Sequence, residues 1–163
     1  MSDAMPYGAG VNQRQGIRMR DDEVAAFIAS RRVATLCTFN HDGTIHAVAM
    51  WYGFLEGAVA FETKAKSQKA RNLLRDQRLT CLFEAGDAYN ELRGVELVGH
   101  AEFVDDPAEM YELGVSVYER YNGPYREDLR PVIEAMLHKR IVAKVVVDRT
   151  VSWDHRKLSQ PQA

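Results

Sequence analysis

The sequence predicts a mainly β fold of the α+β class, in which a small antiparallel β-barrel carries a few helices on its outside. Three observations support this fold class. Most apolar segments are short and rich in β-branched residues, tight turns join several of them, and helical periodicity is confined to a few stretches. A length of 163 residues fits one domain with one core.

The chain should begin with an irregular arm, followed by a helix. The first residues contain scattered glycines and polar residues without any period, which indicates a flexible segment. From Asp21 onward, acidic residues precede Val24, Phe27 and Ile28, whose spacing predicts a short amphipathic helix. The boundaries that we predict are 1–17 for the arm, 18–158 for the single domain and 159–163 for a C-terminal tail.

Three strand-like segments follow and predict an antiparallel meander. Residues 33–39 form a β-rich apolar run, and residues 44–54 return after a turn at Asp42 and Gly43. A third run covers residues 58–63 after another short turn. We therefore expect these three strands to pair in sequence order, which disfavours a parallel α/β fold.

A capped helix is predicted over residues 67–75. Ser67 suits the N-cap position, because its hydroxyl can accept a hydrogen bond from the first turn. Ala70, Leu73 and Leu74 have the spacing of a buried stripe. This helix follows directly after the third strand, so its first turn should lie at the end of the sheet.

The second half of the chain adds a helical excursion between strands. Asp106 and Pro107 are typical of a helix start, and that helix should run to about Arg120. Pro131 opens a further short helix that reaches His138. The strands predicted in this half cover residues 79–83, 94–104 and 141–147.

Composition and charge exclude several classes of function. With 21 basic and 23 acidic residues, the chain has a net charge of -2 and therefore no overall positive field for nucleic acid or an anionic membrane. No apolar run approaches the roughly 20 residues that cross a bilayer, so a cytoplasmic location is expected. Cys37 and Cys81 are expected to be reduced, and the histidines lack metal-ligand spacing, so no metal site is predicted.

The segment 64–78 carries an unusual local charge. It contains one acid, Asp76, and six cations, and so has a charge of +5. Because free N–H groups of a first helical turn attract anions, Ser67 with Lys66 and Lys69 predicts a phosphate site. The alternatives are a solvated helix face or a nucleic-acid contact. The six cations are Lys64, Lys66, Lys69, Arg71, Arg75 and Arg78.

These motifs resemble a known family. Phe61-Glu62-Thr63, Ser67-Gln68-Lys69 and Arg71-Asn72-Leu73 are similar to the strand-to-helix cofactor motif of the split β-barrel flavin and deazaflavin oxidoreductases, the pyridoxamine 5'-phosphate oxidase-like superfamily. Residues 42–51 resemble that family's hairpin turn and second strand, and residues 152–157 resemble the C-terminal motif of its deazaflavin branch. The resemblance implies a split β-barrel of the FMN-binding type.

The resemblance also implies a cofactor site. Ser67 and Lys69 would hold the cofactor phosphate, Thr63 would meet the ribityl chain or the ring edge, and Trp153 would close the pocket from the same or the other subunit. No catalytic residue is assigned. The cofactor-binding residues that the resemblance implies are Val48, Ala49, Met50, Thr63, Lys66, Ser67, Lys69, Asn72 and Trp153.

The family likeness and the local charge together predict the reaction class. Coenzyme F420 carries a phosphodiester and a tail of glutamates, so extra cations near the phosphate favour it over FMN. We therefore expect a homodimeric reductase that transfers a hydride from reduced F420 to an unsaturated or quinone-like small molecule. The alternatives are an FMN-dependent oxidoreductase of the same fold and a non-catalytic protein that binds or stores F420.

Overall fold

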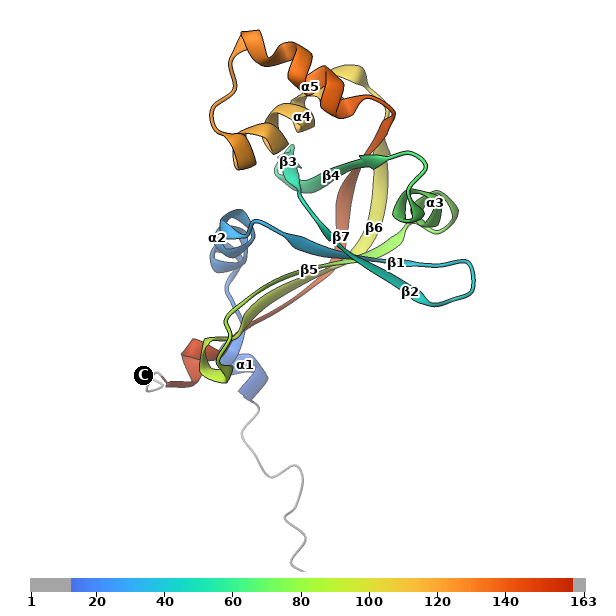
Figure 1. Cartoon of the computed structure of the whole chain (residues 1–163). Coiled ribbons are helices and arrows are strands. Elements are labelled where there is room, and N and C mark those ends of the chain that lie inside the picture. The colour runs from blue at the N-terminus through green and yellow to red at the C-terminus, as the bar shows by residue number, and fades with distance from the viewer. Residues whose placement is uncertain (1–12, 160–163) are drawn as a thin grey trace, which may run out of the picture.

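Seven strands form one curled antiparallel sheet in the computed structural model, which describes residues 13–159 (Figure 1). Their order across the sheet is β2-β1-β5-β6-β7-β4-β3. The prediction of a mainly β, antiparallel fold with helices outside it is confirmed. The strands are β1 (Ala34–Phe39), β2 (Ile45–Met50), β3 (Gly53–Leu55), β4 (Ala58–Lys64), β5 (Arg78–Ala85), β6 (Arg93–Val104) and β7 (Arg140–Asp154).

The helices lie around the rim and the outside of the sheet. Figure 1 shows α4 and α5 together at one end and α3 beside the end of β4. None of the described helices is long and apolar enough to span a membrane. The helices are α1 (Gln13–Ile17), α2 (Asp21–Ser30), α3 (Gln68–Arg75), α4 (Pro107–Asn122) and α5 (Arg130–Leu137), with short 3-10 turns at Tyr89–Glu91, Glu127–Leu129 and His155–Ser159.

The predicted meander is wrong at its second strand. The apolar run 44–54 is divided into β2 and β3, which lie at opposite edges of the seven-stranded order. β2 pairs with β1, whereas β3 pairs with β4. The chain leaves one edge at Tyr52, whose N–H donates to the Tyr121 hydroxyl at 3.1 Å and whose own hydroxyl lies 2.5 Å from the Ile28 carbonyl oxygen. These anchors on α4 and α2 interrupt the strand.

The capped starts of two helices are confirmed. The Ser67 hydroxyl accepts a hydrogen bond from the Ala70 N–H at 3.3 Å, and Asp106 accepts from Ala108 and Glu109 at 2.8 and 3.0 Å. The buried stripe of α3 differs from the prediction, because Leu74 is 63% exposed.

Two further boundaries differ from the predictions. Residues 1–12 of the predicted arm lie outside the described residues, as do residues 160–163 of the predicted tail, but residues 13–17 form the short helix α1. β7 continues to Asp154, well past the predicted end at residue 147, because its second half pairs with β6 while its residues 147–151 stay exposed. Because Asp148, Arg149 and Thr150 are consecutive polar residues, the sequence of this half of the strand lacks the alternation that predicts a strand.

The core divides into two clusters on either side of the sheet. The larger one includes Leu36, Phe61, Phe83 and Leu97 and lies among β1, β4, β5 and β6. The smaller one includes Leu113 and Val142 and packs α4 against β4 and β7. The second cluster therefore holds the helical excursion against β3 and β4.

Candidate functional site

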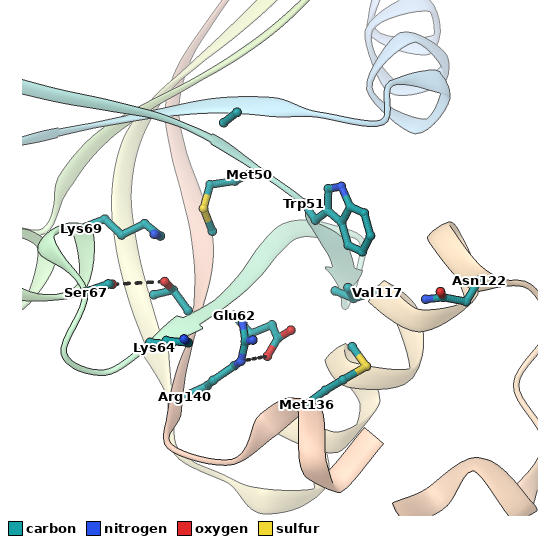
Figure 2. Close-up of a pocket in the computed structure, with 12 residues that line it drawn as sticks. Met50, Trp51, Glu62, Lys64, Ser67, Lys69, Val117, Asn122, Met136 and Arg140 are labelled. Atoms are coloured by element: carbon teal, nitrogen blue, oxygen red, sulfur yellow. Dashed lines mark hydrogen bonds and ion pairs between the residues drawn. The ribbon is translucent and has the colours of Figure 1, made fainter. Parts of the chain in front are cut away.

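A cavity of about 530 Å³ lies between the β4–α3 junction and the two helices α4 and α5 (Figure 2). Its volume falls in the range of roughly 300 to 1,000 Å³ that is typical of small-molecule sites. One end carries Ser67 and Lys69, and the opposite end carries Trp51 and Met136, as Figure 2 shows.

The β4–α3 junction builds the polar end. Thr63 closes the buried part of β4, and its hydroxyl lies 3.2 Å from the Ser67 hydroxyl. Ser67 caps α3, so the first turn of the helix faces the cavity with backbone N–H groups that lack acceptors within the helix. A helix N-terminus with a hydroxyl beside it favours a bound anion.

Three cations and one carboxylate surround this end. Lys64, Lys69 and Arg140 line the cavity together with Glu62. Burial lowers the pKa of Lys69, and the nearby positive charge of Arg140 lowers it further. The excess of positive charge in a partly enclosed space stabilises a bound anion.

Glu62 is a cavity residue that sequence reasoning missed. Its side chain is 9% exposed, and its Oε2 lies 3.4 Å from Nε of Arg140. Within the described residues, Oε2 accepts no hydrogen bond. Burial raises the pKa of Glu62, while the charge of Arg140 opposes that rise. The available signal was the charge itself, since Glu62 is the one charged residue of the predicted strand 58–63.

The other end of the cavity is formed by residues far away in the sequence. Trp51 follows β2, Val117 and Asn122 belong to α4, and Met136 belongs to α5. None of these four residues was predicted to bind the cofactor.

Five of the nine predicted cofactor-binding residues line one cavity. They are Ala49, Met50, Thr63, Ser67 and Lys69. Val48 packs against the larger core cluster, and Lys66 is exposed outside the cavity lining. The cavity therefore combines most of the predicted strand-to-helix residues with two residues of β2, and it leaves Val48 and Lys66 outside its lining.

Asn72 occupies a different position from the one that the resemblance implies. It is fully buried, and its amide group donates hydrogen bonds to the Thr38 hydroxyl at 3.0 Å and to the Asn40 side chain at 2.9 Å. Its own oxygen accepts from Gln68 at 2.9 Å. These bonds tie α3 to β1, so Asn72 positions the helix that carries Ser67.

Trp153 lies in a second hollow. This space of about 660 Å³ is lined by Trp153 and by several cations, among them Arg18 and Arg149. The Trp153 ring covers Gly94, where a Cβ atom would come within 2.1 Å of it. Trp153 is not among the residues that line the cavity of Ser67.

Four of the six predicted cations are not among the residues that line the cavity. Arg75 donates to the Phe39 carbonyl, and Arg78 forms an ion pair with Asp76 at 2.7 Å. Of the six, Lys64 and Lys69 line the cavity. Among the described residues, no group of three or more His, Cys, Asp or Glu side chains could hold a metal ion.

Comparison with solved structures identifies close relatives of the fold. The conserved hypothetical protein Rv2991 from Mycobacterium tuberculosis is 48% identical, with a TM-score of 0.88 over 94% of this chain and 96% of that one. A putative 5-nitroimidazole antibiotic resistance protein from Bacteroides thetaiotaomicron is 16% identical, with a TM-score of 0.69 over 83% of this chain and 84% of that one. An F420 reductase is 25% identical, with a TM-score of 0.59 over 77% of this chain and 93% of that one.

The curated proteins gave no match to the chain. The family model described as pyridoxamine 5'-phosphate oxidase matches residues 21–154, which include every strand, α3 and both walls of the cavity. The chain belongs to the pyridoxamine 5'-phosphate oxidase family.

Proposed function

We propose that this protein is a cytoplasmic reductase that transfers a hydride from reduced coenzyme F420 to an unsaturated or quinone-like small molecule. The observation that carries the proposal is the β4–α3 junction, where Ser67, Lys69 and the first turn of α3 face a cavity of about 530 Å³. The 25% identity to an F420 reductase supports the choice of cofactor.

The cavity residues fit a phosphate-bearing ring cofactor. Ser67 and Lys69 would hold the phosphate, and Thr63 would fix the chain that joins phosphate and ring. Ala49 and Met50 would support the ring from β2. When bound, the deazaflavin supplies the hydride. The protein then orients the two reactants and excludes water between them.

A second candidate is an FMN-dependent oxidoreductase. The observation that favours it is the charge of the cavity itself, because Lys64 and Lys69 are the only two of the six clustered cations that line it. One phosphate needs only a few donors, whereas a glutamate tail gains from additional cations along its path.

We further propose that a second copy of the chain completes the molecule. Apolar side chains stay exposed on β2 and β7, including Ile45 at 65% and Val151 at 38%, and the strand register places both on the same face of the sheet. Exposed apolar residues that share a sheet surface are typical of an interface. A homodimer would cover them and could place the Trp153 hollow of one subunit beside the cavity of the other.

A titration of the purified protein with F420 and with FMN, followed by fluorescence, tests the cofactor. Tighter binding of F420, together with oxidation of reduced F420 when a quinone is added, supports the first proposal. Tighter binding of FMN favours the second candidate. F420 binding without turnover on a broad panel of acceptors indicates a storage protein. Failure to bind either cofactor contradicts both proposals.

A further inference from the structure

Trp51 is an exposed aromatic side chain that is held in one orientation. It is 56% exposed and stands in the short connection between β2 and β3. Its ring stacks on Tyr121 of α4, with a centroid distance of 4.1 Å and an interplanar angle of 4°. One face of the indole is therefore covered by Tyr121, and the exposure of Trp51 must come from its other face and its edges.

Several contacts fix the ring on which Trp51 stacks. The Tyr121 hydroxyl donates to the Arg32 carbonyl oxygen at 2.8 Å and accepts from the Tyr52 N–H at 3.1 Å. The Arg32 guanidinium lies 4.9 Å from the centroid of the Tyr121 ring. A surface that is already ordered loses little conformational entropy when a ligand stacks on it.

The cavity lining nearest to Trp51 consists of uncharged side chains. Val117 and Met136 provide apolar surface there, and Asn122 provides one amide (Figure 2). The Asn122 amide nitrogen donates to the Tyr118 carbonyl at 3.3 Å. Lys64 and Lys69 lie toward the opposite end, around the β4–α3 junction, and the ion pair of Glu62 and Arg140 lies between the two ends (Figure 2).

We propose that Trp51 is the stacking platform for the electron acceptor and that this acceptor is a flat, uncharged, conjugated ring compound. This inference rests on the proposed function, because it places the acceptor in the same cavity as the cofactor. A parallel aromatic face selects planar π systems. The apolar wall of Val117 and Met136 disfavours a charged group, because burying a charge without a partner is costly.

Calorimetric titration of the full chain with menadione, a flat and uncharged quinone, tests the platform with and without saturating F420. The variants are Trp51→Leu and Trp51→Phe, with Tyr89→Leu as a control at another exposed aromatic residue. We expect Trp51→Leu to weaken menadione binding about tenfold, whereas Trp51→Phe and Tyr89→Leu stay within about twofold of the unchanged protein. The anionic 1,4-naphthoquinone-2-sulfonate should bind more weakly than menadione.

The cofactor titration separates this inference from the proposed function. Trp51→Leu should keep the F420 affinity within about threefold of the unchanged protein, because Trp51 lies at the other end of the cavity from Ser67. Its melting temperature should fall by no more than about 4 °C, because the variant loses the stacking contact with Tyr121 but no buried side chain. Normal F420 binding with unchanged menadione affinity in Trp51→Leu would overturn the platform alone. Sulfonate binding as tight as that of menadione would overturn the uncharged class. Absence of F420 and FMN binding would instead overturn the proposed function.

Discussion

The molecule has two hollows with cations and a tryptophan, but they are built differently. The cavity beside α3 combines a capped helix start, two lysines, Arg140 and the buried Glu62, and Trp51 stands at its apolar end. The hollow at the end of β7 combines Trp153 with arginines and has no carboxylate in its lining. Residues that a family resemblance assigns to one cofactor site therefore need not share one cavity within a subunit.

We expect the largest loss of cofactor affinity when a cation that lines the cavity is removed, and a much smaller loss when a cation outside the cavity is removed. Lys69→Ala should raise the dissociation constant of the cofactor by about 10- to 100-fold, because a charge-assisted hydrogen bond to phosphate contributes about 1.5 to 3 kcal/mol. Arg71→Ala removes an exposed charge from the same helix and should change the constant by less than about threefold. Fluorescence titration measures both. Equal effects of the two variants would show that only the overall charge of α3 matters.

A second test asks whether Asn72 contributes to cofactor binding or to the stability of the fold. Asn72→Ala should lower the free energy of unfolding by about 1 to 3 kcal/mol, because it leaves the buried Thr38 hydroxyl without its donor. Urea denaturation measures this loss. Cofactor affinity of the folded variant should stay within about twofold of the unchanged protein. A variant with full stability and weakened cofactor binding would instead show that Asn72 contributes to the phosphate site.

A third test asks whether Trp153 contributes to the cofactor site of a second subunit. If the Trp153 hollow closes the cavity of a second copy, Trp153→Ala should weaken cofactor binding by about 2- to 10-fold, which is the range of a lost stacking contact. Mixing subunits that carry Lys69→Ala with subunits that carry Trp153→Ala should then regenerate one intact site in each mixed dimer. Titration of the mixture would reveal sites of the original affinity. Their absence would confine each cofactor to one subunit.

The smallest effect that we expect is on the pH dependence of stability, and it comes from Glu62, the buried carboxylate that the cavity has and the Trp153 hollow lacks. Burial raises the pKa of Glu62 in the folded protein above its ordinary value of 4.5. The folded state therefore binds a proton more tightly than the unfolded state, and stability from this group is lost as the pH rises from about 4.5 through the raised pKa. Urea denaturation across this pH window should show a fall in stability for the unchanged protein that is reduced in Glu62→Gln. Identical pH profiles would mean that Glu62 does not titrate there.

The candidate site could be predicted only in part, because its two ends are built in different ways. Ser67, Lys69 and Thr63 lie within seven residues of one another, and strand, cap and charge mark them together. Trp51, Asn122 and Met136 come from three elements that meet only through the smaller core cluster and the Tyr121 anchors.

Sequence patterns were sufficient to predict the antiparallel β class, the turn at Gly43, where φ is +83°, and the helix caps at Ser67 and Asp106. These features depend on backbone groups and side chains within a few residues of each other, so local chemistry is sufficient. The division of the run 44–54 between two edges of the sheet, and the separation of Trp153 from Ser67, arise from long-range packing. Strand partners and cavity walls depend on which distant surfaces bury one another, and no local spacing records that choice.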